Sequence, residues 1–390
     1  MESIPSFSAP LPGQVIFGSG RVAELGDVAA GFGSRALLVI GGTSLRRSGY
    51  LAHIEAALRN GGVEWDVLSG VPAEPGVEWV DEGRQKLRAL SAEMVIGVGG
   101  GSVLDVAKAI AALAKEEAPC VAFHRGEAKV TRRGLPCIAL PTTAGTGAEA
   151  TPNAVLSDRE RRVKASLRGG DLLPAVALVD PQLTLSCPPD VTAYSGLDAI
   201  SQALESWVSV GSNPFSDMLA LKALRLMAPA LPQAVGDGAN LSAREAMALG
   251  SLFAGMALAS ARLGLVHGLA HPIGELYHLP HGLVCGLLMP SVMEFNLPVA
   301  AGKYAAAARE LGLCGPGSSD EEAAETLIAW FRSLLAQLGV GRPLGEYGLS
   351  ASDFDFIIQQ GLPAGSTKHN PRQPTASDLQ ALLQRLLSAY

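Results

Sequence analysis

Aromatic and charged side chains are both scarce in this sequence. Phe, Trp and Tyr account for 5% of the 390 residues, and Asp, Glu, Lys and Arg account for 17%. Few aromatics argue against a recognition surface built from stacked rings. Few charges, together with 48% hydrophobic residues, exclude a disordered chain. The net charge of −7 argues against a nucleic-acid partner, because phosphate binding needs a basic face.

Cysteine is also rare, and its pattern argues against two classes of protein. The five cysteines are odd in number and no two are spaced as CxxC, so neither a disulfide framework nor a structural zinc ribbon is indicated. The N-terminus lacks the basic and apolar regions of a secretory signal. The uncharged stretch 246–261 is shorter than a membrane-spanning helix and contains Gly and Ser. We therefore expect a cytoplasmic protein with no membrane partner.

The chain is longer than one hydrophobic core usually fills, so two domains are expected. In its first half, short apolar segments alternate with segments of helical periodicity. Strands are expected at 36–40, 64–68, 94–98, 136–140 and 175–179, and helices at 50–60, 79–90 and 102–114. This alternation predicts βαβ units and a mostly parallel sheet. The later sequence is Ala/Leu-rich with helical spacing. The predicted fold class is α/β + all-α, with an α/β domain over 1–187 and an all-helical domain over 188–390.

Two polar loops follow neighbouring expected strands. The first contains the phosphate-binding candidates Gly99, Gly100, Gly101 and Ser102, with Asp105 on the first turn of the next helix. Glycines let a backbone approach a pyrophosphate, and a helix N-terminus offers free N–H groups. The second loop contains Thr142, Thr143 and Thr146, whose hydroxyls are suited to a nucleotide. Two interpretations stay open for both loops, namely nucleotide binding or ordinary tight turns.

Polar residues recur at helical spacing in the second half of the chain. Asp198 and Gln202 are four residues apart, and so are His267 and His271; His281 follows ten residues after His271. Residues at i and i+4 share one helix face. Imidazole and carboxylate side chains together are typical ligands of divalent metals. The spacing alone leaves open whether they form a metal site or a buried hydrogen-bonded network.

Taken together, these segments resemble the iron-containing (group III) alcohol dehydrogenase family. The resemblance covers essentially the whole chain and rests on the stretches 99–105, 140–149, 266–272, 280–282 and 368–372. It implies a dinucleotide-binding α/β domain, a helical metal-binding domain, and catalysis in the cleft between them. It also implies a nicotinamide cofactor, a small alcohol or aldehyde as substrate, and a homodimer or higher homo-oligomer.

The resemblance also assigns roles to single residues. Asp198, His267 and His281 match three of the four metal ligands, while the fourth position, a histidine in the family, is Gln202 here. A neutral amide oxygen is a poorer ligand than imidazole for Fe²⁺ or Zn²⁺. The site therefore holds metal more weakly, with Gln202 or water completing the shell, prefers another metal, or is empty. His271 matches a position near the nicotinamide and is a candidate for proton relay. Loop 142–146 and Lys164 match cofactor-contacting positions.

The choice of nicotinamide depends on the segment after the first core strand. NAD-preferring relatives have an Asp there that repels a 2′-phosphate, and the matching residue here is Gly41. Gly41, Gly42 and Thr43 offer backbone N–H and hydroxyl donors instead. Arg46 or Arg47 would add a charge-assisted bond, unless both point to solvent. We predict NADP(H) in preference to NAD(H).

Alternative functions within and outside this activity stay open. The family includes maleylacetate reductases and reductases of phosphono- or sulfo-aldehydes, and motifs do not assign a cationic substrate pocket. A different class is a catalytically silent nucleotide-binding protein, in which Gln202 marks the loss of metal.

Overall fold

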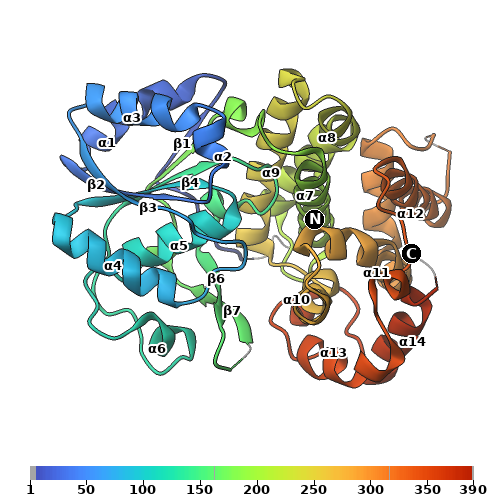
Figure 1. Cartoon of the computed structure of the whole chain (residues 1–390). Helices are drawn as coiled ribbons and strands as arrows, with labels where there is room; N and C mark the ends of the chain where they lie inside the picture. Colours follow the sequence, from blue (N-terminus) through green and yellow to red (C-terminus); the bar gives the residue numbers. More distant parts are fainter. Residues whose placement is uncertain (1–5, 162, 316, 389–390) are drawn as a thin grey trace. The chain divides into compact units, whose positions relative to one another are not determined.

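The computed structural model describes residues 6–161, 163–315 and 317–388. They form two compact units (Figure 1). The α/β unit is Pro10–Cys187, and the helical unit is Pro188–Tyr390 together with the N-terminal segment, of which residues 6–9 are described. The α/β + all-α fold class predicted from the sequence is confirmed.

A six-stranded parallel sheet in the order β1-β8-β5-β4-β2-β3 forms the centre of the α/β unit. Its strands are β1 (Gln14–Phe17), β2 (Arg35–Ile40), β3 (Glu64–Leu68), β4 (Met94–Gly99), β5 (Cys137–Pro141) and β8 (Val176–Val179). The helices of this unit are α1 (Leu25–Ala30), α2 (Ser44–Arg47), α3 (Tyr50–Asn60), α4 (Glu78–Leu90), α5 (Gly101–Ala112) and α6 (Cys120–His124). Figure 1 shows helices on both faces of the sheet.

Alternating side chains of each central strand enter two different cores. On β2, Leu37 belongs to the core that contains Ile110 of α5, whereas Leu38 belongs to the core that contains Ile54 of α3. All four are fully buried. A strand buried on both faces reads as a continuous apolar run, which is why the sequence shows its parallel strands so clearly.

The direction in which the chain adds strands to the sheet reverses between β2 and β4. From β2 the chain passes to β3 on one side, and it then returns to β4 on the other side of β2. In open parallel sheets, ligands bind beyond the carboxyl ends of the strands at such a point. The loops that begin at Gly41 and Gly100 leave β2 and β4 at this position.

Three strands of the α/β unit, β1, β6 (Asn153–Asp158) and β7 (Val163–Arg168), are not among the expected strands. β6 and β7 form a separate antiparallel pair. Buried residues alternate with half-buried ones along β6, and most residues of β7 are half-buried or exposed, so both strands lack the apolar run that marks β2, β4, β5 and β8.

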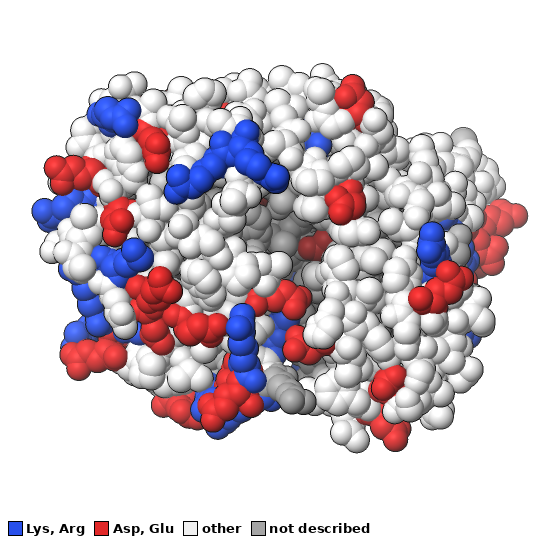
Figure 2. Space-filling model, in the orientation of Figure 1, with Lys and Arg blue, Asp and Glu red and all other residues white. Residues whose placement is uncertain are grey.

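On the face shown in Figure 2, acidic and basic side chains of the chain are interspersed.

The second unit is built from long helices. They are α7 (Pro189–Val208), α8 (Pro214–Gly236), α9 (Leu241–Ala261), α10 (Leu265–Tyr277), α11 (His281–Glu310), α12 (Asp320–Gln337), α13 (Phe354–Gly361) and α14 (Ala376–Leu386). Pro214 occupies the first turn of α8 behind a capping box formed by Asn213 and Ser216. Proline is favoured there because its missing N–H has no partner inside the helix.

Helix α11 is long and apolar enough to span a membrane, as is the bent pair α9–α10 if it is taken as one segment. However, 78% of the most apolar window of α11 is buried within the structure. A core helix of a globular protein has the same composition, because both of its faces contact other helices.

The first described residues pack on the helical unit, although the expected boundary assigns them to the α/β domain. The ring of Phe7 stacks on Phe215 with centroids 6.4 Å apart. The backbone carbonyl of Ser8 accepts a hydrogen bond of 2.9 Å from the Ser260 hydroxyl. The helical unit therefore includes both ends of the described chain.

Candidate functional site

Three helices of the helical unit place polar side chains around one point. Asp198, Gln202 and Glu205 occupy one face of α7, because they are spaced by four and three residues. His267 lies on the first turn of α10, and His281 is the first residue of α11. All of these except His281 are buried.

The predicted metal ligands lie close together. Nε2 of His267 is 3.2 Å from Oδ1 of Asp198, and Nε2 of His281 is 3.8 Å from the same oxygen. The two imidazole rings meet edge to face with centroids 5.4 Å apart. Asp198 and His281, which are 83 positions apart in the sequence, thus lie at one site. The i,i+4 spacing within each helix does not by itself bring them together.

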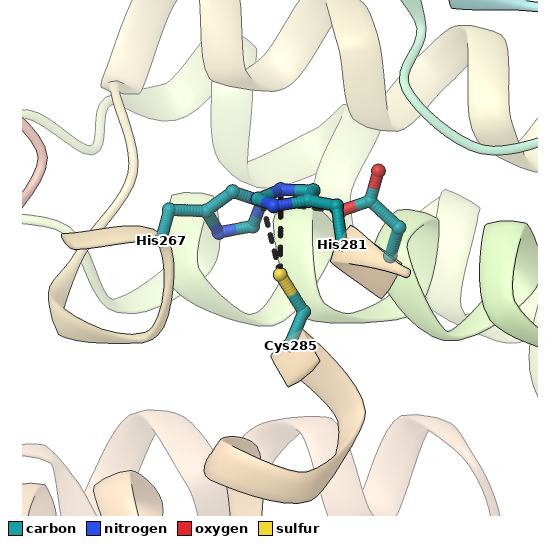
Figure 3. Close-up of side chains that lie close together, drawn as sticks. His267, His281 and Cys285 are labelled. Atoms are coloured by element: carbon teal, nitrogen blue, oxygen red, sulfur yellow. Dashed lines mark hydrogen bonds and ion pairs between the residues drawn. The ribbon is translucent and has the colours of Figure 1, made fainter. Parts of the chain in front are cut away.

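Cys285 joins this group, and the sequence analysis does not anticipate it. Its Sγ is 3.5 Å from Nε2 of His281 and 3.8 Å from Nε2 of His267. Figure 3 shows the sulfur directed at both rings from one turn further along α11. One donor atom from each of Asp198, His267, His281 and Cys285 lies within 4.8 Å of the others. The available signal is the i,i+4 spacing of Cys285 from His281.

Four of the six separations between the donor atoms are close to those around a single metal ion, and all six are within 4.8 Å. With metal–nitrogen or metal–oxygen bonds of about 2.0 Å and metal–sulfur bonds of about 2.3 Å, tetrahedral geometry separates neighbouring ligand atoms by about 3.3–3.6 Å. The four measured separations run from 3.2 to 3.8 Å. The donor set of imidazoles, a carboxylate and a thiol is suited to a divalent transition metal.

Glu205 is a second residue that the sequence analysis does not single out. Its Oε2 is 2.5 Å from Nδ1 of His267, and its Oε1 accepts a bond of 2.6 Å from the backbone N–H of Val266. Asn370 accepts from the neighbouring N–H of Leu265 at 3.1 Å. These acceptors satisfy the first free N–H groups of α10 and hold His267 with Nε2 facing Asp198.

The electrostatics of the group favour a bound cation. Burial raises the pKa of Asp198, but hydrogen bonding to His267 and the charge of His281 outweigh it, so this pKa lies below its usual value. Burial lowers the pKa of His267, yet the acidic groups around it, Cys285 and then Glu205, bring this pKa well above its usual value. The site therefore attracts positive charge, which a proton or a metal ion supplies.

The two remaining predicted residues lie beside this group. The side-chain amide of Gln202 donates a hydrogen bond to Asp198, while its Oε1 is buried without a hydrogen-bond partner in the part of the chain that the structure describes. The ring of His271 stacks on His281 with centroids 4.9 Å apart. Both residues thus contact a predicted ligand.

The predicted cofactor loops are in contact within the α/β unit. The backbone N–H of Thr142 donates to the carbonyl of Gly99 at 3.0 Å. A Cβ on Gly101 would lie 2.6 Å from Oγ1 of Thr146, so this position admits only glycine without a shift. A Cβ on Gly100 would meet Thr143 at an ordinary 3.5 Å. The two glycines therefore differ, since Gly101 allows the loops to pack, whereas a side chain at position 100 would make only ordinary contacts.

Three other predicted cofactor residues have distinct surroundings. Asp105 is buried, and its oxygens accept from Nζ of Lys108 at 3.1 Å and from the backbone N–H of Val155 at 2.9 Å. Nζ of Lys164 is 2.6 Å from Oε1 of Glu74. The backbone N–H of Glu74 in turn donates to the Ser102 hydroxyl at 3.3 Å. The structure brings Lys164 next to the glycine-rich loop, while the Asp105 carboxylate joins α5 to β6.

The segment at the end of β2 is open. Gly42 and Thr43 are exposed, and a Cβ on Gly42 would meet no atom within 4 Å. Gly41 lies against α5, because its Cβ would be 3.4 Å from Cγ2 of Val103. Arg46 is exposed on the short helix that follows. This segment thus adjoins the start of α5 at the reversal point of the sheet.

Comparison with known proteins assigns the chain. The model for "Iron-containing alcohol dehydrogenase" matches residues 12–181, and the model for the C-terminal part, "Fe-containing alcohol dehydrogenase family, C-terminal", matches residues 192–387. The chain belongs to the iron-containing alcohol dehydrogenase family. It is 35% identical to "Probable alcohol dehydrogenase EutG" of Escherichia coli (98% of this chain and 94% of that protein). It is 34% identical to 1,3-propanediol dehydrogenase of Klebsiella pneumoniae (97% of this chain and 98% of that protein).

The structures of the family agree with this assignment. A crystal structure of a 1,3-propanediol oxidoreductase matches with a TM-score of 0.94 and 34% identity, covering 98% of this chain and all of the other. The family predicted from the sequence motifs is confirmed. The protein is therefore an oxidoreductase that transfers a hydride between a nicotinamide cofactor and a small alcohol or aldehyde.

Proposed function

We propose that this member of the family is a metal-dependent aldehyde reductase and alcohol dehydrogenase that prefers NADP(H). The metal ligands are Asp198, His267 and His281, and His271 relays the proton. The observation that carries the proposal is the convergence of these ligands from α7, α10 and α11, with Nε2 of His267 3.2 Å from Asp198. A buried network alone would not need three donors directed at one point.

The chemistry assigned to each residue follows from its surroundings. A bound divalent metal polarises the carbonyl of an aldehyde and lowers the pKa of an alcohol hydroxyl. Asp198 supplies a negative charge that partly neutralises the metal. Glu205 fixes the proton of His267 on Nδ1 and leaves Nε2 free to bind. Leu265 and Leu269 are fully buried beside the histidines and exclude water.

His271 is assigned the proton transfer. Its ring is stacked on His281 at 4.9 Å between centroids, and it lies one turn along α10 from His267. Histidine has an ordinary pKa near neutrality, so it exchanges protons readily at physiological pH. In this assignment His271 gives a proton to the product alkoxide during reduction and takes it back during oxidation.

The cofactor is bound by the loops after β2, β4 and β5. The residues assigned to it are Gly41, Gly42, Thr43, Gly99, Gly100, Gly101, Ser102, Asp105, Thr142, Thr143, Thr146 and Lys164. The position of the first two loops at the reversal point of the sheet supports this assignment. No carboxylate occupies 41–43, and Gly42 and Thr43 are exposed, which supports NADP(H) over NAD(H).

A turnover assay tests the proposed activity. NADPH oxidation is followed with a panel of short aldehydes, and the assay is repeated after exhaustive chelation and with His267→Ala. We expect the wild type to turn over, to lose activity on chelation and to regain it when Zn²⁺ or Fe²⁺ is added. We expect no activity from His267→Ala, even with added metal. Turnover that survives both treatments would show that the reaction does not need this centre. Nucleotide binding without turnover of any substrate would favour a catalytically silent protein.

We also propose a homodimer located in the cytoplasm. The dimer rests on family resemblance, and sedimentation at micromolar concentration tests it, since a monomer alone would contradict it. The location rests on the five cysteines, none of which is in a disulfide and two of which are only partly buried. Free thiols are typical of a reducing compartment.

A further inference from the structure

Cys285 is the one thiol that faces the candidate ligands. It is fully buried on α11, one helical turn after His281, and its Sγ is within 3.8 Å of two imidazole nitrogens. The other four cysteines lie outside this group of donors. A buried thiol is usually an inert packing group. The direction of this sulfur distinguishes it from that ordinary role.

The distances favour a ligand over a packing group. Sγ lies 3.5 Å from Nε2 of His281 and 3.8 Å from Nε2 of His267, against about 3.6 Å for a sulfur and a nitrogen on one tetrahedral ion. His281 begins the first turn of α11, and Cys285 lies at the end of that turn. Two ligands at i and i+4 of one helix form a chelating pair, so both are held in place by the same backbone.

Gln202 is the competitor for the fourth position. Its amide N–H groups are directed to Asp198, and its Oε1 is buried without a hydrogen-bond partner among the described residues. A neutral amide oxygen is a weak ligand for a transition metal, whereas a thiolate is a strong one. When both are near, the thiolate is favoured and the amide orients Asp198.

We propose that Sγ of Cys285 is the fourth protein ligand of the metal centre and that the centre therefore selects Zn²⁺ over Fe²⁺. This inference rests on the proposed function, because it requires the metal held by Asp198, His267 and His281. On binding, the S–H proton is released to solvent and the thiolate sulfur forms the bond to the metal. Soft thiolate ligands favour zinc, while imidazole accepts either metal.

The test uses the full chain stripped of metal and reconstituted with Co²⁺ or Zn²⁺. Co²⁺ bound by a thiolate gives a sulfur-to-metal charge-transfer band in the near ultraviolet, and X-ray absorption of the Zn²⁺ form reports a sulfur neighbour at about 2.3 Å. The variants are Cys285→Ala and Gln202→Ala. Cys314→Ser is the matched control, since Cys314 follows the far end of α11.

The expected result is a charge-transfer band in the wild type, Gln202→Ala and Cys314→Ser, and its loss in Cys285→Ala. The affinity for Zn²⁺ should fall at least about a hundredfold in Cys285→Ala, beyond what loss of an outer partner causes. The Zn²⁺/Fe²⁺ preference, measured anaerobically, should fall with it. Circular dichroism verifies that each variant is folded.

Three results would overturn the inference, and they are distinguishable. Stoichiometric metal binding without a thiolate band, with Cys285→Ala as tight as the wild type, would leave the proposed function standing and remove Cys285 from the site. Loss of metal in Gln202→Ala but not in Cys285→Ala would assign the fourth position to the amide. If the wild type binds neither Co²⁺ nor Zn²⁺, the proposed function fails together with the inference.

Discussion

Oε2 of Glu205 lies 2.5 Å from Nδ1 of His267, and this contact sets the direction of the imidazole. Glu205 also accepts from the N–H of Val266, so one carboxylate begins α10 and orients its histidine. A histidine held in this way presents Nε2 to a metal without losing rotamer freedom on binding. Metal binding and helix packing are thus coupled through a residue that is not itself a ligand.

Glu205→Gln should weaken metal binding without unfolding the helical unit. The amide keeps an acceptor for Val266 but no longer stabilises the proton on Nδ1 of His267, so affinity for Zn²⁺ should fall about 10- to 100-fold. Competition with a coloured chelator measures this. Glu325→Gln, at an exposed position of α12, is the matched control. Equal affinity of both variants and the wild type would remove Glu205 from the account.

Gly100→Val should block the cofactor while the fold remains. Gly100 has φ −72° and ψ 179°, which any residue adopts, and a Cβ there makes only an ordinary contact. The valine side chain would instead occupy the space that we assign to the pyrophosphate. The affinity for NADPH should fall more than about tenfold, because at least one charge-assisted hydrogen bond is lost. Gly170→Val, in open space, is the control. Unchanged affinity, measured by calorimetry, would show that the phosphates bind elsewhere.

Gly41→Asp should reverse or erase the preference for NADPH. A carboxylate at the end of β2 would repel a 2′-phosphate and bind ribose hydroxyls. Gly41→Asn has the same size and no charge, so it corrects for contact with Val103. The ratio of kcat/KM for NADPH to that for NADH should be at least about tenfold lower in Gly41→Asp than in Gly41→Asn. A wild type that favours NADH would contradict the preference itself.

Glu149 should make stability depend on pH. Burial raises its pKa to about 7, so between about pH 4.5 and 7 the folded state holds a proton that the unfolded state has lost. The free energy of unfolding therefore falls as pH rises through this window, by at most about 3 kcal/mol. Glu149→Gln removes this loss. The melting temperature of the variant minus that of the wild type should therefore increase between pH 5 and pH 8. A difference in melting temperature that stays constant with pH would contradict the raised pKa of Glu149.

The parallel strands β2, β4, β5 and β8 could be predicted from the sequence because their burial on both faces leaves a continuous apolar run, whereas the partly exposed strand β1 was not predicted. Helix α3 and strand β3 have the predicted bounds, 50–60 and 64–68. The hairpin β6–β7 was not predictable by that signal, because buried apolar residues alternate with polar or partly exposed ones along it. It is also held by a contact from outside, because the N–H of Val155 donates to Asp105 on α5.

The candidate site was predictable in part for a related reason. The i,i+4 pairs indicate which residues share a helix face, but not which helices pack together. Cys285 and Glu205 therefore escaped notice, because their role depends on α7, α10 and α11 meeting. Once Asp198 is taken as a ligand, Glu205 is seven residues further along the same face, and Cys285 stands four residues after His281.

The most direct test of the metal centre is the metal content of the purified protein. Elemental analysis after gentle purification, with Zn²⁺ or Fe²⁺ supplied and excess removed, gives ions per chain for the wild type and for the His267→Ala, His281→Ala double variant. We expect close to one ion per chain in the wild type and almost none in the double variant. Equal metal content in both proteins, or none in the wild type after reconstitution, would contradict it.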